Sequence, residues 1–414
     1  MRAATGWRGA RLAAVVAVTS GTLGLAGLIV TTGSAQADPA STTAFVGVGA
    51  DVTQDLFAAY TGASPAPGYS SATTTFYTPL HSSAATNNYT IASFDASPFG
   101  GTTTSPGCIT TKTGGPSFDR PSSTTAGVAA LLDSVTNTGW ENSSGSCTNA
   151  SVSVTGQIDF ARAARGPKGS GTTLTWIPYA RDGLGILYYD HGDGNLASLT
   201  TAELANLYSQ PTGQATINGD TVDACLPISG STPRSNLEAA IGVSDATAQT
   251  AAAAVGCANI TQNSGNAFWT FASGLAGSPN QVDAVIPISA GSWESQANGV
   301  AVDRSASART NGVDLASITD GSSVLGQPYT GTAPSEAPNT TYYQSTKYGY
   351  NLYTVVPTSD VSGFFVNAAI ESLFSGSSSA ICSSAAQTTA HTFGFDSLTA
   401  GEGTCGSITT EGNT

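Results

Sequence analysis

Short β-prone apolar runs alternate with amphipathic helical segments along this chain. The first run, 43–48, leads through glycine into a segment whose Leu56, Phe57 and Tyr60 suit one face of a helix. The other runs that we interpret as extended segments are 91–94, 158–161, 176–179, 186–189, 283–288 and 350–356. The pair 176–179 and 186–189 is expected to flank a turn. Strands that alternate with helices predict an α/β fold.

Three helices between these strands carry start signals. Residues 200–203 (Thr-Thr-Ala-Glu) form a capping box, Ser123 or Thr124 can cap a second helix, and Pro233 suits the first turn of a third, which Gly242 ends. The apolar faces predicted behind these starts are Leu204, Leu207 and Tyr208; Val128, Leu131, Leu132 and Val135; and Leu237, Ala240 and Ile241. The stretch 322–349 is rich in Gly, Pro, Ser and Thr and predicts a long loop.

The first 37 residues have the order of a secretory signal peptide. Three arginines precede a mostly apolar run, 12–30, and Ala35-Gln36-Ala37 forms a small-residue cleavage site before Asp38. An uncleaved anchor is the alternative, because 19 apolar residues can just span a bilayer. Hydroxyl residues inside the run favour cleavage, and the absence of a nearby cysteine argues against lipid attachment. The sequence predicts a secreted protein, extracellular or cell-wall associated.

The net charge of the predicted mature chain argues against some classes of binding partner. The leader holds three of the 13 basic residues and none of the 27 acidic ones, so residues 38–414 carry a formal charge of −17. A surface this acidic repels nucleic acid and anionic lipid, and we expect neither as a partner. The chain has only three lysines and abundant Ala, Gly, Ser and Thr, a composition that resembles secreted actinobacterial proteins.

Six cysteines follow the leader, and an even number in an oxidising compartment predicts disulfides. Six cysteines allow 15 connectivities. Because they fall into neighbouring pairs that close loops of modest length, we predict the bridges Cys108–Cys147, Cys225–Cys257 and Cys382–Cys405. No Cys-x-x-Cys pair occurs and the three histidines lie far apart, so we expect no metal site.

Three segments place small polar residues at predicted helix starts. A helix N-terminus offers unpaired N–H groups and a partial positive charge, so each segment could hold an anion, although a single one is usually an ordinary cap. Arginines nearby add charge and a planar fork suited to an oxyanion. The candidate ligand-binding residues are Ala50, Asp51, Thr53, Ser122, Ser123, Thr124, Arg162, Arg165, Ser229, Gly230, Ser231, Thr232 and Arg234.

The order of these motifs resembles the phosphate-binding proteins of bacterial uptake systems, the PstS-like branch of the type 2 periplasmic-binding fold. The similar segments are 47–51 for the glycine-rich first turn, 122–125 for a Ser-Ser-Gly-Gly helix start, 160–167 for Phe-Gly-Ala-Ser-Asp-x-Pro, 199–208 for Leu-Thr-x-x-x-Leu-x-x-Ile-Phe and 229–232 for Ser-Gly-Thr-Thr. The chain departs from the family at 162–165, where alanine and arginine replace an aspartate, and it lacks the arginine before 229–232.

The resemblance implies two α/β lobes that close on a ligand in the cleft between them. We place residues 38–178 in lobe 1, 179–349 in lobe 2, and 350–414 in a segment that returns to lobe 1. It implies a monomeric solute-binding protein for a small oxyanion, phosphate first, with no cofactor, and leaves an ABC transporter open as a partner. In the family a buried carboxylate accepts the phosphate proton, and Asp51 is the candidate here.

Enzyme signatures are scarce. The chain has no Gly-x-Ser-x-Gly elbow, Walker loop or His-Glu-x-x-His motif, and His81, His191 and His391 have no recognisable partner pattern. We interpret 190–195 as a polar turn. A non-enzymatic binding protein is therefore the first expectation. A secreted surface protein that reuses the fold without a ligand and a phosphate-ester hydrolase are the alternatives.

Overall fold

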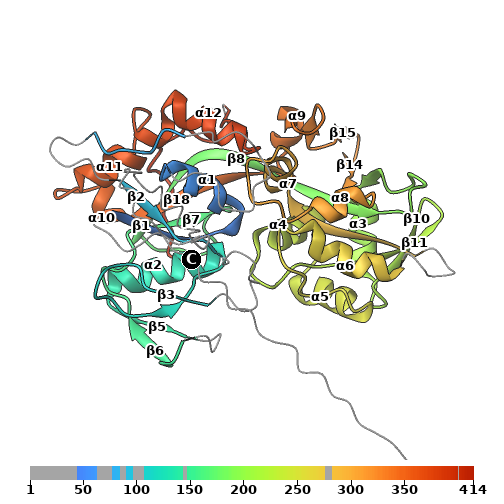
Figure 1. Cartoon of the computed structure of the whole chain (residues 1–414), viewed down its shortest axis with the longest axis horizontal. Coiled ribbons are helices and arrows are strands. Elements are labelled where there is room, and N and C mark those ends of the chain that lie inside the picture. Colours follow the sequence, from blue (N-terminus) through green and yellow to red (C-terminus); the bar gives the residue numbers. More distant parts are fainter. Residues whose placement is uncertain are drawn as a thin grey trace, which may run out of the picture. The chain divides into compact units, whose positions relative to one another are not determined.

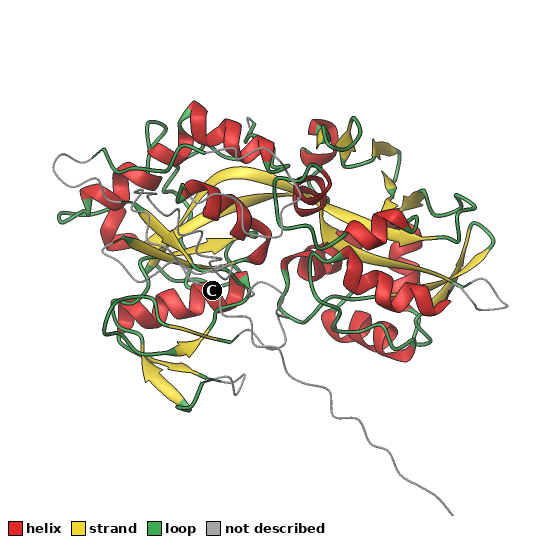
Figure 2. Cartoon of the chain, viewed as in Figure 1, coloured by secondary structure: helices red, strands yellow, loops and turns green. Residues whose placement is uncertain are grey.

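The computed structural model describes residues 44–62, 77–83, 90–96, 107–142, 147–275, 282–399 and 401–414, and residues 35–414 form one compact unit. The predicted signal peptide lies outside the described residues. Strands and helices are mixed along the chain, which confirms the predicted α/β class (Figure 2). No helix of the described part is both long and apolar enough to cross a bilayer.

A nine-stranded mixed sheet organises the fold, in the order β10-β11-β12-β8-β18-β7-β1-β2, with β13 also paired to β8. Its members are β1 (Phe45–Gly49), β2 (Ile91–Ser93), β7 (Phe160–Ala163), β8 (Leu174–Tyr189), β10 (Gln214–Ile217), β11 (Asp220–Ala224), β12 (Asp283–Ser289), β13 (Asp314–Leu315) and β18 (Gly349–Pro357).

Strand β8 joins two strand groups. Its first part pairs antiparallel with β18, beside which β7, β1 and β2 follow, and Figure 1 traces the two long strands side by side. Its last residues, from Leu184, pair antiparallel with β12, which continues to β11 and β10. The prediction of a turn between 176–179 and 186–189 is wrong, because both runs belong to this one strand and both of its edges are hydrogen-bonded.

The helices fall into two sets according to their position in the chain relative to β8 and β18. The helices that precede β8 or follow β18 are η1 (Asp51–Thr53), α1 (Gln54–Tyr60), α2 (Thr124–Thr136), α10 (Thr358–Val361), α11 (Ala368–Phe374), η2 (Ala380–Cys382) and α12 (Ser384–Thr392). Those between β8 and β18 are α3 (Thr201–Ser209), α4 (Thr232–Ile241), α5 (Asp245–Ala254), α6 (Gly265–Leu275), α7 (Ala290–Ala297), α8 (Ala306–Thr310) and α9 (Thr340–Tyr343).

Small sheets complete the described chain. They consist of β3 (Cys108–Ile109) with β4 (Phe118–Asp119), β5 (Gly139–Glu141) with β6 (Ser151–Ser153), β9 (Ser198–Thr200) with β14 (Ser317–Asp320) and β15 (Ser323–Gly326), and β16 (Tyr329–Thr330) with β17 (Ala337–Pro338). The prediction of a structureless loop over 322–349 is wrong, because β15, β16, β17 and α9 lie within it. Their short ladders and the cap at Asn339 satisfy the backbone there.

The buried apolar side chains fall into separate clusters. Two clusters draw their buried members from within 184–348, and a third takes them from 46–176 together with Val355. A fourth combines 50–180 and 352–395 with Ala301. The chain therefore has a core on each side of β8. The lobe boundaries at 178/179 and 349/350 remain a proposal, and β8 and β18 are the strands that cross them.

The predicted helix starts are confirmed. Thr200 and Glu203 form a complete capping box, Ser123 Oγ accepts the Ala126 N–H, and Gly242 ends α4 in the left-handed conformation. The predicted face of α2 needs one correction, because Val135 is 40% exposed. The face toward the sheet is instead formed by the buried residues Gly127, Val128, Ala130, Leu131 and Ser134, which follow the helical period.

Gly127 lets the start of α2 lie directly against the end of β1. A Cβ atom on Gly127 would lie 2.4 Å from the Gly49 Cα atom, so a larger residue would force the helix away from the strand. Gly49 has φ of +115°, a conformation that favours glycine. These two glycines hold the first turn of α2 beside the turn that follows β1.

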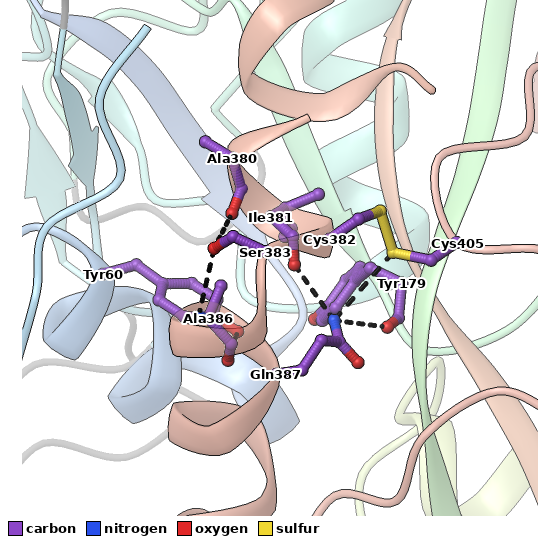
Figure 3. Close-up of a disulfide and its surroundings, with 9 residues drawn as sticks. All are labelled: Tyr60, Tyr179, Ala380, Ile381, Cys382, Ser383, Ala386, Gln387 and Cys405. Carbon is purple, nitrogen blue, oxygen red and sulfur yellow. Dashed lines mark hydrogen bonds between the residues drawn. A yellow bond between two sulfur atoms is a disulfide. The ribbon is translucent and has the colours of Figure 1, made fainter. Parts of the chain in front are cut away.

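All three predicted disulfides are confirmed: Cys108–Cys147, Cys225–Cys257 and Cys382–Cys405. Figure 3 shows the last bridge beside the Gln387 side chain, whose Nε2 donates to the carbonyl oxygens of Ile381 and Tyr179 at 2.9 and 3.1 Å. The bridge fastens the C-terminal segment to η2, and Gln387 of α12 links η2 to β8 through Tyr179.

Candidate functional site

Two of the helix starts singled out in the sequence, η1 and α4, follow strands with a parallel neighbour, whereas α2 follows β4, which pairs antiparallel with β3. Strands β1 and β7 are parallel, and η1 and the Arg162–Arg165 segment lie at their carboxyl ends. In the other strand group, β11 and β12 are parallel and precede α4 and α7. In open α/β sheets ligands bind beyond the carboxyl ends of the strands, where helix N-termini supply free N–H groups.

Two of these helix starts meet through their threonines. Thr124 opens α2 and Thr232 opens α4, and their Oγ1 atoms lie 3.2 Å apart. Both residues are buried. Thr124 Oγ1 also accepts the backbone N–H of Ala164 at 3.0 Å, which ties the contact to the end of β7. The structure thus brings together three segments that are separated by up to 108 residues in the sequence.

Ser231 stands next to this contact as the N-cap residue of α4. Its side chain is fully buried, and within the described part of the chain its Oγ makes no hydrogen bond, neither to the N–H groups of the helix nor elsewhere. Ser123, the corresponding residue of α2, caps its own helix instead. Ser229 and Gly230, which precede Ser231, are exposed. A buried hydroxyl without a partner is costly, and it is a group that a ligand can satisfy.

Two further hydrogen bonds connect the strand groups, one between Gln262 and Ser122 and one between Asn263 and Asp51. Gln262 Nε2 donates to the Ser122 carbonyl oxygen at 3.1 Å, and Asn263 Nδ2 donates to Asp51 Oδ2 at 2.8 Å. A cavity of about 20 Å³ lies beside Asp51 and is also lined by Gln262, Asn263 and Arg304. Burial raises the pKa of Asp51 to about 6, against the Asn263 hydrogen bond and the Arg304 charge. Asp51, the first residue of η1, is therefore a carboxylate that can gain or lose a proton near pH 6.

Gln262, Asn263 and Arg304 were not identified as site residues from the sequence. No motif or period marks them, although the polar run 261–264 (Thr-Gln-Asn-Ser) indicates a turn and Asn263 has φ of +51°. Asn263 also accepts the Ser289 N–H through its side-chain oxygen, and Arg304 pairs with Asp55 at 3.3 Å. These residues come from loops whose meeting with η1 depends on the tertiary fold.

The side chain of Arg162 makes its hydrogen bonds to β1, to β2 and to the turn after β1. Its guanidinium is fully buried and donates to Ser93 Oγ at 2.6 Å and to the carbonyl oxygens of Gly47, Gly49 and Ala50 at 3.2 to 3.5 Å. Burial lowers its pKa to about 10. The side chain therefore holds the end of β1 and the Ala50 turn from within its own strand group, where we had predicted a contact with the ligand.

Arg234 is also directed elsewhere than predicted. Its nitrogens contact Glu238 at 3.2 Å, Asp245 at 2.7 Å and Gln249 at 2.7 Å, and one donates to the Pro227 carbonyl oxygen. Burial and the neighbouring Asp245 raise the pKa of Glu238 to about 7. The prediction overlooked that an arginine in the first turn of α4 has carboxylates at the helix face and at the start of α5 within reach.

The remaining predicted residues are Arg165, Thr53 and Ala50. Arg165 Nη2 donates to Thr125 Oγ1 at 3.0 Å, so this arginine lies against the first turn of α2, and burial lowers its pKa. Thr53 is buried at the end of η1 near the Tyr179 phenol. Ala50 donates its N–H to the Arg162 carbonyl oxygen at 3.0 Å. Of the predicted arginines, Arg165 alone borders a helix start through a hydroxyl.

One histidine has a partner that the sequence did not reveal. His191 Nδ1 lies 2.8 Å from Asp283 Oδ1, and its Nε2 lies 3.3 Å from the Leu275 carbonyl oxygen. Because both ring nitrogens have partners, the imidazole is not free to act as a general base. The polar turn predicted at 190–195 is confirmed. Cys108, Asp119 and Cys147 also lie close together, but both cysteines are in a disulfide and offer no thiolate to a metal.

No protein family model and no curated protein matches this sequence. Solved structures with a similar fold include a phosphate-bound substrate-binding protein from Clostridium perfringens, with 13% identity over 86% of this chain and 99% of that one, at a TM-score of 0.44. PstS from Borrelia burgdorferi has 13% identity over the same shares, at 0.40. An ABC-type phosphate transport receptor from Vibrio cholerae has 16% identity over 67% of this chain and 86% of that one, at 0.37.

These solved proteins are of the kind that the motif order resembles. Their similarity concerns the fold, and at such scores it assigns no role to any residue of this chain. The contacts between the helix starts are what indicate a site in this chain.

Proposed function

We propose that this chain binds a small tetrahedral oxyanion, phosphate first, where the starts of α2 and α4 meet. The observation that carries the proposal is the Thr124–Thr232 hydroxyl contact of 3.2 Å beside the buried Ser231 Oγ, which lacks a partner among the described residues. An oxyanion that replaces this contact receives three hydroxyl donors and the N–H groups of two helix N-termini. Arg165, which contacts Thr125 in the first turn of α2, supplies a positive charge.

The first prediction separates binding from helix capping. Ser231→Ala removes a hydroxyl that caps nothing in the described structure, so we expect phosphate affinity to fall about tenfold while the free energy of unfolding stays nearly constant. Ser244→Ala is the matched control, because Ser244 Oγ caps α5 by accepting the Thr247 N–H. It is expected to lose about 1 kcal/mol of stability and to keep its phosphate affinity.

Titration calorimetry with phosphate and denaturant unfolding, on the wild type and both variants, measure the two quantities. Equal phosphate affinity in Ser231→Ala and the wild type contradicts the assignment of the site. No binding of phosphate, sulfate or simple organic acids by the wild type favours a surface protein that has lost its ligand. Turnover of a generic phosphate ester favours the hydrolase.

The second prediction concerns selectivity. Monohydrogen phosphate carries a proton that sulfate lacks, so a site that prefers phosphate needs an acceptor. Asp51, with a pKa raised to about 6, is ionised at neutral pH and serves as that acceptor in this proposal. We expect Asp51→Asn to reduce the ratio of phosphate to sulfate affinity by about tenfold or more, through loss of a charged hydrogen bond. Asp55→Asn on the adjacent helix is the control, because Asp55 pairs with Arg304.

Calorimetric titration of both anions into both variants gives this ratio. Equal affinity of the wild type for the two anions excludes the role of Asp51 and leaves the helix-start site intact. A ratio that falls equally in Asp55→Asn excludes a specific role and assigns the effect to the net charge of the region.

The same proposal includes the export, the two lobes and the oligomeric state of the protein. An oxyanion receptor of this kind acts as a secreted monomer with lobes 38–178 and 179–349, after removal of residues 1–37, with an ABC transporter as an open partner. N-terminal sequencing of the protein from culture medium tests cleavage, and sedimentation tests the monomer. A mature chain that retains residues 1–37 contradicts secretion by cleavage.

A further inference from the structure

A second cavity lies between β8, α7, α8 and β16, apart from the helix starts. Its volume is about 310 Å³, and its lining residues are Tyr188, Trp293, Arg309, Gly312, Val313, Asp314, Tyr329 and Glu336. Ligand pockets have volumes of about 300–1,000 Å³ and combine aromatic walls with a few placed polar groups. This cavity lies at the small end of that range, which suits a ligand of monosaccharide size.

The polar groups of this cavity are held in place. The Arg309 guanidinium stacks over the Trp293 ring at 5.3 Å, and its Nη2 pairs with Asp303 at 2.5 Å. The Tyr329 hydroxyl donates to Asp314 Oδ1 at 3.1 Å. Glu336 is fixed through its backbone, which exchanges two hydrogen bonds of 2.8 Å with the Asn298 side chain. Side chains that are positioned before binding lose little entropy when a ligand arrives.

Two buried atoms of the lining residues have unused hydrogen-bonding capacity. Arg309 Nη1 and Glu336 Oε2 are both buried, and neither has a hydrogen-bond partner within the residues that the structure describes. One is a donor and the other is a carboxyl oxygen, and both belong to residues that line the cavity. Burial, followed by the nearby Asp314, raises the pKa of Glu336 to about 7, so this carboxyl can accept or donate near neutral pH.

The charges restrict the class of ligand. Asp314 and Glu336 repel an anion, so this is not a second oxyanion site. The Arg309 charge in the same wall repels a cation. A neutral molecule with donors and acceptors on neighbouring atoms fits both leftover groups, and a pair of adjacent hydroxyls on a sugar ring has this chemistry. The aromatic rings of Tyr188 and Tyr329 offer apolar surface for the C–H face of such a ring.

We propose that this cavity binds a neutral sugar unit, with Arg309 and Glu336 each hydrogen-bonded to adjacent hydroxyls. The inference is independent of the oxyanion site, because none of the lining residues belongs to the starts of α2 or α4.

Titration calorimetry of the full chain with glucose, galactose, mannose, xylose and N-acetylglucosamine tests the proposal. At least one of these sugars is expected to bind, and both Glu336→Gln and Arg309→Lys to weaken it by about tenfold. Because Glu336→Gln removes a buried carboxyl oxygen without a described partner, its melting temperature is expected to match or exceed that of the wild type. Glu141→Gln, at an exposed position, is the control with unchanged affinity.

Three outcomes overturn the sugar site. One is the absence of binding by all five sugars, and another is equal sugar affinity in the wild type and both variants. The third is binding of alanine or phosphate, in place of sugars, that Glu336→Gln abolishes. Phosphate affinity at the helix starts is expected to be the same in Glu336→Gln and the wild type, so failure of one proposal is distinguishable from failure of the other.

Discussion

Replacement of Arg162 by methionine is expected to lower the free energy of unfolding by about 3 kcal/mol or more, because several buried acceptors lose their donor and each unsatisfied group costs about 1–3 kcal/mol. The guanidinium is fully buried and supplies the donors for Ser93 Oγ and for the carbonyl oxygens of Gly47, Gly49 and Ala50. Methionine fills much of the volume but donates nothing. The Gly47 carbonyl oxygen keeps the Phe94 N–H, but the other acceptors lose this donor in a place that water does not reach, and that loss destabilises the protein.

Denaturant unfolding of the wild type, Arg162→Met and Arg162→Lys measures this effect. Lysine keeps the charge but has no planar fork, so an intermediate loss is expected. Lys347→Met serves as the surface control, because Lys347 pairs with Asp320 while 47% exposed, and it is expected to lose less than about 1 kcal/mol. A loss below about 1 kcal/mol in Arg162→Met would show that the arginine does not support the β1 turn.

Stability is expected to depend on pH through Glu294. This residue is fully buried on α7, and burial raises its pKa well above the ordinary value. The Tyr343 hydroxyl lies 2.7 Å from Glu294 Oε1 and 2.8 Å from the Gly394 carbonyl oxygen. The hydroxyl has one proton for these two acceptors, and its hydrogen bond to Glu294 lowers the pKa of the carboxyl by less than burial raises it. The fold therefore favours the protonated carboxyl.

The sign of the pH effect follows from the raised pKa. The folded state keeps a proton that the unfolded state releases above the ordinary glutamate pKa of about 4.3. The contribution to stability is therefore fully present below that pH. It decreases by at most about 1.4 kcal/mol per pH unit as the pH rises toward the folded pKa.

Glu294→Gln isolates this effect, because glutamine is neutral and its side-chain oxygen can accept the Tyr343 hydrogen bond as Glu294 Oε1 does. We expect the unfolding free energy of the variant, relative to the wild type, to increase as the pH rises from about 5 to about 8. Urea unfolding at several pH values gives this difference, and Glu141→Gln should show none. A constant difference for Glu294→Gln would mean that Glu294 is ionised in the folded protein.

Much of the fold was predictable because its signals are local. The Thr200–Glu203 capping box, the Ser123 cap and the Gly242 stop depend on residues within one helical turn. The disulfides could be predicted because each closes a loop of 39 residues or fewer between neighbouring cysteines. The alternation of apolar runs predicted α/β layers, since a strand and a helix each bury one face.

The candidate site was predictable only in part. The helix starts at Thr124 and Thr232 were identified from composition, but Gln262, Asn263 and Arg304 carry no local signal. The partners of two arginines were unpredictable for a related reason. Nothing near Arg162 in the sequence shows that its side chain lies beneath β1, and Arg234 had its carboxylate partners on the same helix and the next one.

The amino-acid sequence by itself determined where helices begin, which cysteines pair and that strands alternate with helices, because these depend on neighbours along the chain. Only the tertiary structure decided that β8 is one strand paired along both edges, that Thr124 meets Thr232, and that Arg309 and Glu336 border one cavity. These features depend on which distant groups lose water together, and a linear pattern does not encode the partner that each buried group will find.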